Sequence, residues 1–147
     1  AALGEEFLKS GTTTVGDMAV VKQFAQVMGS EWKAFGLRGM YGYMADLATE
    51  PRWYRVHETF TEDADLAANI MKTLVEHLQG GPLNPKSPVA LTMKHFPGGG
   101  PQELGLDPHY AFGKNQVYPA GNFGWHLKPW KAAIDAGASS IMPSACI

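Results

Sequence analysis

Helical and strand-like segments alternate along this chain of 147 residues, and this alternation limits the possible folds more than any other feature of the sequence. Apolar residues recur at helical spacing in three stretches, and a short apolar run typical of a buried strand follows each stretch. Two strands joined through a helix run parallel, because the crossover returns the chain to the starting end of the sheet. The pattern therefore predicts an α/β fold with a parallel sheet.

The first helix is expected over residues 17–35. Asp17 is a favourable N-cap, the apolar residues that follow recur at helical spacing, and Gly36 provides a C-terminal stop. Residues 1–16 are mixed in character and are interpreted as a loop or the tail of an earlier element. The three short apolar runs predict strands over residues 40–48, 89–93 and 139–143.

The limits of the other two helices depend on capping residues and breakers. Thr61 or Thr59 can cap the second helix, which Gly80 ends. The third helix falls within residues 125–136, and Pro129 restricts its start to the residue before that proline. A long loop joins the second strand to this helix, and loops of such length usually build a site.

Charged residues gather where the first two expected strands end. In parallel α/β folds, ligands bind beyond the carboxyl ends of the strands. Guanidinium and ammonium groups donate hydrogen bonds to hydroxyl groups and carboxylates, so a cluster of them predicts a pocket for hydroxyl-rich or anionic partners. The residues concerned are Asp46, Glu50, Arg52 and Arg55 on the first strand and after it, and Lys94 and His95 at the end of the second.

Lys94 and His95 are adjacent in a strand, where successive side chains point to opposite faces. For both side chains to reach one pocket, the backbone has to depart from regular strand geometry at this point. Departures of this kind occur mainly at functional sites. We therefore expect a distorted or cis peptide near Lys94, His95 or Phe96.

Several of these residues also have a structural interpretation. In that interpretation the two arginines, Arg52 and Arg55, are solvated or paired with Glu58, Glu62 and Asp63, and His95 is a structural histidine. Asp107 and His109 form either a local turn or an acid/base pair. The aromatic residues near these positions pack in the core unless they form a platform for stacking on sugars; they are Tyr41, Tyr43, Trp53, Trp125 and Trp130.

Composition and spacing exclude several classes of protein. A net charge of −2 and a pI of about 6.2 argue against a nucleic-acid or anionic-membrane binder, and no apolar run reaches the length of a membrane span. Cys146 is the single cysteine, which excludes a disulfide framework. The histidines lack the spacing of a metal site, so we expect neither a metal nor a cofactor. Gly98–Gly100 lacks the phosphate-loop pattern, although an α/β phosphate-binding enzyme stays a competing hypothesis.

Two blocks of the sequence resemble glycoside hydrolase family 3, a family of β-glucosidases. Residues 46–63 contain Glu-Pro-Arg-Trp-Tyr-Arg and end in Thr-Glu-Asp, which is similar to the family's Asp-Pro-Arg-Trp-Gly-Arg block with its following acids. Residues 89–98 are similar to the family's strand that ends in Lys-His-Phe-(Val/Pro)-Gly. Residues 136–143 resemble the next strand of the family's barrel, so order and spacing agree from about residue 17 to 143.

The resemblance implies that residues 1–147 form part of an N-terminal (β/α)8 barrel domain, with about three βα units and truncation at both ends. For the intact protein it implies retaining hydrolysis of terminal non-reducing β-D-glucosyl residues. In the family, the second arginine of the first block and the Lys-His pair bind sugar hydroxyls in the −1 subsite. These roles fall on Arg55, Lys94 and His95, with Arg52 and Glu58 as supporting residues.

The chain also departs from the family pattern. Tyr54 stands where the family usually has Gly, and Glu50 stands where it has Asp. The family's nucleophile is the Asp of a Ser-Asp-Trp motif, which this sequence lacks, and its acid/base usually comes from a further domain. We therefore identify no catalytic residue here and expect the chain alone to be inactive. The expected partners are a β-glucoside or oligosaccharide, the remainder of the barrel and a C-terminal domain.

Three alternatives stay open. The β-N-acetylglucosaminidase branch of the family has a Lys-His-Phe-Pro-Gly block followed by an Asp-x-His acid/base, and Lys94–Gly98 with Asp107 and His109 is similar to it. A β-xylosidase-like enzyme and a non-catalytic carbohydrate-binding fragment are the other two. The compartment stays open between cytoplasm and secretion, because the chain shows no signal peptide and one cysteine fits either.

Overall fold

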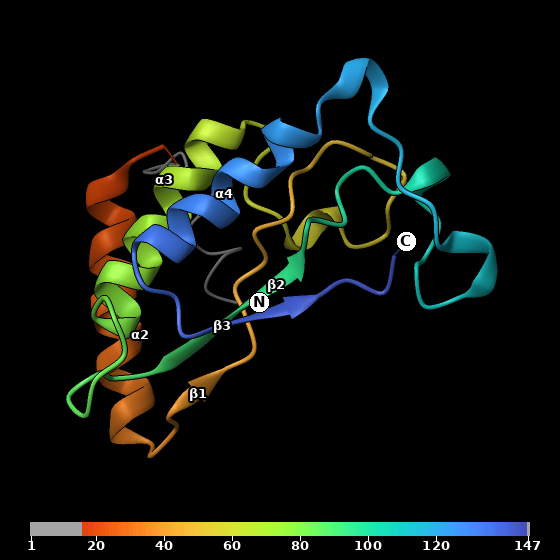
Figure 1. The fold of residues 1–147 in the computed structure, drawn as a ribbon. Coiled ribbons are helices and arrows are strands. Elements are labelled where there is room, and N and C mark those ends of the chain that lie inside the picture. The colour runs from red at the N-terminus through yellow and green to blue at the C-terminus, as the bar shows by residue number, and fades with distance from the viewer. Residues whose placement is uncertain (1–15, 147) are drawn as a thin grey trace.

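A computed structural model describes residues 16–146 of the chain. Three parallel strands form a sheet in the order β1 (Gly39–Met40), β2 (Ala90–Phe96) and β3 (Ser140–Pro143). Three helices lie side by side against the sheet, with α3 in the middle (Figure 1). They are α2 (Met18–Ala34), α3 (Ala64–Leu74) and α4 (Phe123–Asp135). The predicted α/β class, with parallel strands alternating with helices, is confirmed.

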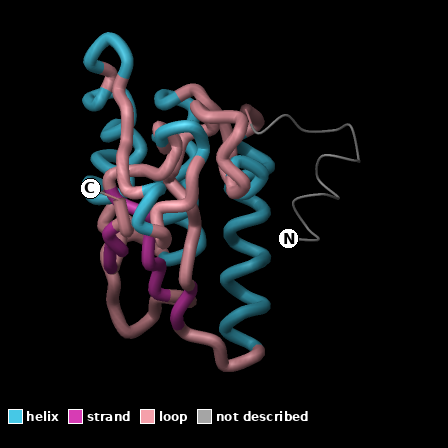
Figure 2. Tube along the Cα trace, turned by 90° about the vertical axis from the view of Figure 1, so that its right-hand side faces the viewer, coloured by secondary structure: helices cyan, strands magenta, loops and turns pink. Residues whose placement is uncertain are grey.

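Short helical turns connect these elements. The loops that carry most of them gather beyond the carboxyl ends of the strands, as the side view in Figure 2 shows. Within residues 16–146, no helix has the length and apolar character needed to cross a bilayer. The loop expected over residues 1–16 lies outside the described residues except for Gly16. The turns are η1 (Val56–Glu58), η2 (Val75–Gln79, a π-helical turn that continues α3), η3 (Glu103–Gly105), η4 (Ala111–Gly113) and η5 (Pro119–Gly121).

Helix α2 begins and ends as predicted. The Asp17 carboxylate accepts hydrogen bonds from the backbone N–H groups of Ala19, at 3.0 Å, and Val20, at 3.3 Å. At the other end Gly36 has a φ of +79°, the left-handed conformation in which glycine ends helices without steric cost. Both signals act within a few residues, which is why the sequence alone predicts them.

The expected cap of the second helix was wrong. Asp63 is the N-cap of α3, and its carboxylate accepts from the N–H groups of Asp65 and Leu66 at 2.8 and 3.1 Å. A carboxylate there also interacts favourably with the positive end of the helix dipole. The two threonines serve the preceding turns instead: Thr61 accepts from the Asp63 N–H, and Thr59 donates to the carbonyl of Val56.

The first strand is much shorter than the predicted range of 40–48. Regular pairing stops after Met40, and the chain rejoins β2 through one isolated bridge between Met44 and Lys94. Gly42 lies in the gap, and glycine weakens the interior of a strand because it has no side chain to pack. The bridge still matters for the site, because it fixes the segment that follows against the end of β2.

The third helix begins five residues earlier than predicted, at Phe123, and contains Pro129. A proline in the helix interior lacks an N–H and costs about 3 kcal/mol. Packing outweighs that cost here, because Pro129 and Trp130 are buried against the neighbouring elements. The strands β2 and β3 agree with the predicted runs, and β2 continues through Lys94 and His95 to Phe96.

A buried glutamine ties α3 to the sheet. Gln79 is fully buried, and its amide nitrogen donates to the carbonyls of Gly81 and Gly137 at 2.6 and 2.7 Å. Its Oε1 accepts from the backbone N–H groups of Leu91 and Ser139, both at 3.1 Å. All its hydrogen-bonding groups are therefore used. Its contacts with Leu91 at the start of β2 and with Gly137 and Ser139 just before β3 hold the two strands in register below the site.

Candidate functional site

A cavity of about 160 Å³ lies at the carboxyl ends of β2 and β3. Its walls come from four parts of the chain that are distant in sequence. Arg55 and His95 line one side, residues 107–109 line another, and residues 142–145, at the end of β3 and directly after it, close a third. Parallel α/β folds bind their ligands at this end of the sheet, so the cavity is a candidate ligand site.

The peptide bonds around the end of β2 are those that the sequence analysis anticipated. Lys94–His95 and Phe96–Pro97 are both cis. The expectation of a distorted or cis peptide near this tripeptide is therefore confirmed. A third cis bond, between Gly42 and Tyr43, was not anticipated.

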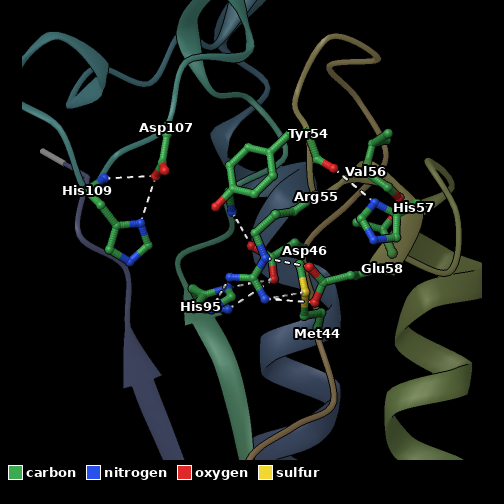
Figure 3. Close-up of polar contacts among 12 residues, drawn as sticks. Met44, Asp46, Tyr54, Arg55, Val56, His57, Glu58, His95, Asp107 and His109 are labelled. Atoms are coloured by element: carbon green, nitrogen blue, oxygen red, sulfur yellow. Dashed lines mark hydrogen bonds and ion pairs between the residues drawn. The ribbon is translucent and has the colours of Figure 1, made fainter. Parts of the chain in front are cut away.

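His95 is held between a buried acid and an arginine. The Asp46 carboxylate accepts a hydrogen bond from the His95 backbone N–H at 3.0 Å, and its Oδ2 lies 3.5 Å from the His95 Nδ1. The other side of the ring faces Arg55, whose Nη1 is 3.1 Å from Nε2 (Figure 3). His95 and Asp46 are both buried, with 8% and 2% of their surfaces exposed.

Arg55 is oriented by a two-point ion pair. Its Nε and Nη2 donate to the two carboxylate oxygens of Glu58 at 2.6 and 2.7 Å. Hydrogen bonding to Arg55 lowers the pKa of Glu58, against the opposing effect of burial, and the same pair raises the pKa of Arg55. The guanidinium therefore remains charged and lies with one edge on Glu58 and its Nη1 toward His95 (Figure 3).

Lys94 lies next to this group without lining the cavity. Its ammonium is over the ring of Tyr41, with 4.5 Å between the nitrogen and the ring centroid. Burial lowers the pKa of Lys94, and the nearby charge of Arg55 lowers it further. Arg55 and His95 are thus in direct contact, whereas Lys94 is close enough to Arg55 to influence it electrostatically.

Arg52 is directed elsewhere. It forms its own two-point pair with Glu50, with distances of 2.9 and 2.7 Å, and its side chain is 61% exposed. The structural interpretation of the sequence left the two arginines solvated or paired with Glu58, Glu62 and Asp63. Arg55 does pair with Glu58, whereas Arg52 is largely exposed and pairs with Glu50, which was not among the expected partners. Arg55 forms its ion pair with Glu58 and also lines the cavity.

Asp107 and His109 form a close pair at the rim of the cavity. Asp107 Oδ1 is 2.7 Å from His109 Nδ1 and also accepts from the His109 backbone N–H at 3.0 Å. Burial raises the pKa of Asp107, but hydrogen bonds from His109 and from Tyr54 outweigh it and leave the pKa below its usual value. The local turn is therefore present, and the side-chain contact leaves the acid/base pair as a hypothesis.

The glycine run after Phe96 is used for close packing and internal hydrogen bonds. A Cβ on Gly99 would lie 2.8 Å from the ring of Trp53 and 3.0 Å from Asp46 Oδ1, so a larger residue does not fit. The Gly99 N–H donates to Asp46, and the Gly98 N–H donates to the carbonyl of His95. These two N–H groups are not available to a phosphate, which disfavours the phosphate-binding hypothesis.

Two parts of the site were not predicted from the sequence. Asp46 was noted at the end of the first strand, but its contacts to the backbone of His95 and Gly99 were not anticipated. A buried acid between the apolar residues Ala45 and Leu47 is the signal that points to such a role. The wall at 142–145 was also missed, because it depends on the order of the strands. Among the described residues, no group of three or more His, Cys, Asp or Glu side chains is arranged to hold a metal ion.

This chain is similar to known proteins in both sequence and fold. The chain matches the family described as "Glycosyl hydrolase family 3 N terminal domain" over residues 9–147. It is 47% identical over 133 residues to the probable beta-glucosidase C of Aspergillus flavus, covering 90% of this chain and 21% of that protein. A crystal structure of beta-glucosidase from Listeria innocua in complex with glucose gives a TM-score of 0.78 at 30% identity, over 91% of this chain and 18% of that chain. A family 3 beta-N-acetylglucosaminidase from Paenibacillus gives a TM-score of 0.77 at 25% identity, over 91% and 24% of the two chains.

The chain spans about a fifth of the length of these relatives. The structural likeness agrees with the predicted assignment of its strands and helices to a part of a (β/α)8 barrel. The family match covers both sequence blocks on which the resemblance rested and continues through β3. This chain therefore belongs to glycosyl hydrolase family 3 and represents sequence of that family's N-terminal domain.

Proposed function

We propose that this chain supplies the −1 sugar-binding part of the active site of a retaining β-glucosidase. The observation that carries the proposal is the pairing of Arg55 with His95 at a cavity beyond the carboxyl ends of the strands. Guanidinium and imidazole groups in fixed positions hydrogen-bond to sugar hydroxyls with defined geometry. Lys94 adds a positive charge beside them and completes the set of three substrate-binding residues.

These residues bind and position the sugar but do not cleave the bond. A retaining glycosidase needs two carboxyl groups about 5–5.5 Å apart, one as the nucleophile and one as the acid/base. We propose that the remainder of the barrel and a C-terminal domain supply these groups, with residues 1–147 forming about three βα units. Hydrogen bonds to the hydroxyls strengthen as the oxocarbenium-like transition state forms, so Arg55 and His95 contribute to rate as well as to affinity.

Calorimetric titration of the full-length gene product tests this proposal. Glucose is expected to bind and inorganic phosphate is not, and an aryl β-glucoside is expected to be hydrolysed. The variants Arg55→Ala and Lys94→Ala should lose sugar affinity and keep the circular-dichroism spectrum of the parent. Phosphate binding without glucose binding would refute the proposal. A separate test uses the isolated chain of 147 residues, for which we expect no hydrolysis of the aryl β-glucoside.

A second candidate is β-N-acetylglucosaminidase activity, which the 2.7 Å contact between Asp107 and His109 favours. In this arrangement Asp107 orients the imidazole and His109 acts as the acid/base at the rim of the cavity. The variant His109→Ala separates the candidates. A large loss of activity on an aryl β-N-acetylglucosaminide supports the second candidate, and unchanged activity on an aryl β-glucoside supports the first. An aryl β-xyloside in the same assay tests the β-xylosidase alternative.

A further inference from the structure

Asp46 is the most completely buried acid next to the cavity, yet it has no direct access to a ligand there. Its side chain is not among the groups that line the cavity, and 2% of the residue is exposed. One carboxylate oxygen accepts from the backbone N–H of Gly99, and the other accepts from the backbone N–H of His95 at 3.0 Å. Burying a carboxylate is costly unless hydrogen bonds compensate it, so this position has a structural or functional reason.

The partners of the His95 ring assign the position of its proton. Nε2 lies 3.1 Å from Nη1 of Arg55, and a guanidinium has only N–H donors. While this contact is made, Nε2 is the acceptor and the proton of the neutral ring is on Nδ1, so the contact persists only where Nδ1–H is the favoured tautomer. Nδ1 faces the Asp46 carboxylate, 3.5 Å from Oδ2. A ring protonated on both nitrogens would instead place an N–H group against the guanidinium.

We infer that Asp46 is a positioning residue that holds His95 as the Nδ1–H tautomer and thereby makes Nε2 a hydrogen-bond acceptor at the cavity. The carboxylate acts on both parts of the residue at once. It anchors the backbone of His95 and Gly99 across the turn, and it attracts the Nδ1 proton of the ring. This inference rests on the proposed function, because it specifies how the same site selects its ligand.

The consequence is a preference for hydroxyl groups over other acceptors. Arg55 and Lys94 carry only donors, whereas Nε2 of His95 accepts. A sugar hydroxyl that displaces the direct hydrogen bond between Arg55 and His95 accepts from the guanidinium and donates to Nε2, so both groups stay paired. A fluorine, an ether or a phosphate oxygen without a proton that takes the same place accepts from the guanidinium but leaves Nε2 without the partner that it had in Arg55. An unpaired polar group in such a site lowers affinity by roughly tenfold.

The first test measures the tautomer in the full-length gene product labelled with ¹⁵N-histidine. Nitrogen–proton correlation spectra distinguish a protonated ring nitrogen from an unprotonated one, and the variant His95→Gln assigns the signal. We expect an unprotonated Nε2 and a protonated Nδ1 in the unmodified protein. An Nε2–H tautomer would overturn the inference, and this measurement needs no folded variant of Asp46.

The second test compares Asp46→Asn with a matched control, Asp63→Asn. Asp63 also accepts two backbone N–H groups, but it does so at the start of α3 and away from the cavity. We expect Asp46→Asn to shift His95 toward the Nε2–H tautomer and to lower glucose affinity roughly tenfold. The control is expected to change neither. An unchanged tautomer in Asp46→Asn, or an equal loss of affinity in the control, would overturn the inference.

Monofluorinated glucose analogues complete the experiment. In the unmodified protein, fluorine at one ring position should reduce affinity roughly tenfold, and in Asp46→Asn the same substitution should cost much less. Equal tolerance of fluorine at every position would contradict the inferred acceptor. If glucose itself does not bind, the proposed function fails, while the tautomer measurement still decides the role of Asp46.

Discussion

The ion pair between Arg55 and Glu58 allows a quantitative test of the proposed sugar-binding site. Glu58→Gln replaces one carboxylate oxygen with an amide and removes one of two contacts of 2.6 and 2.7 Å. A shielded charge-assisted hydrogen bond contributes about 1.5–3 kcal/mol. The two side chains are 18% and 36% exposed, and solvent screening moves this value toward the lower range of exposed pairs. We therefore expect a loss of about 1 kcal/mol in sugar binding, or roughly fivefold in affinity.

Calorimetric titration of glucose into the full-length gene product measures this loss, and Glu50→Gln is its matched control. Glu50 holds Arg52 with the same two-point geometry, at 2.9 and 2.7 Å, within the same segment. Arg52 does not line the cavity, so the control is expected to leave glucose affinity within a factor of two. Equal losses in both variants would show that the segment, and not Arg55, is affected. An unchanged affinity in Glu58→Gln would refute the role assigned to Arg55.

Three further predictions concern pH and stability. Arg55 lowers the pKa of Glu58, so their ion pair stabilises the fold fully above the unfolded-state pKa of Glu58, near 4.5. This stabilisation is lost as the pH falls through the lower pKa of the folded state. In urea unfolding, the stability difference between the parent and Glu58→Gln should therefore persist at pH 5 and vanish in stronger acid. Gly99→Ala places a Cβ 2.8 Å from the ring of Trp53 and should cost about 1–3 kcal/mol in urea unfolding; unchanged stability would contradict the packing. Asp63→Ala removes the cap of α3 and should cost about 1 kcal/mol without changing glucose affinity.

The parts of the fold that were predicted from sequence are those decided by neighbouring residues. The ends of α2 depend on Asp17 and Gly36, which act on the helix that they adjoin. The parts that were wrong depend on distant contacts. Helix α4 passes through Pro129 because its buried face packs against the rest of the core, and no local rule anticipates that gain. The return of the chain to β2 after the end of β1 is similarly a distant contact, the bridge between Met44 and Lys94.

The candidate site divides in the same way. Arg55 and His95 were selected from their places in two sequence blocks, and the structure brings them to 3.1 Å. Their supporting contacts were less accessible to sequence reasoning. The spacing of three residues between Arg55 and Glu58 makes their ion pair readable from the sequence. The contact of Asp46 with the backbone of His95 joins positions 49 apart, and only the bridge after β1 makes it possible.

The charges of the site favour the proposed sugar ligand over a phosphate. Arg55 and Lys94 are two cations, and the carboxylates of Glu58 and Asp46 lie beside them, so the cluster is close to neutral. A phosphate needs an excess of positive charge or a row of free backbone N–H groups. Here Glu58 occupies one edge of the guanidinium, and Asp46 takes the N–H groups of His95 and Gly99. What remains is an array of directed donors with one histidine acceptor and little net charge, which matches the uncharged hydroxyl groups of a sugar.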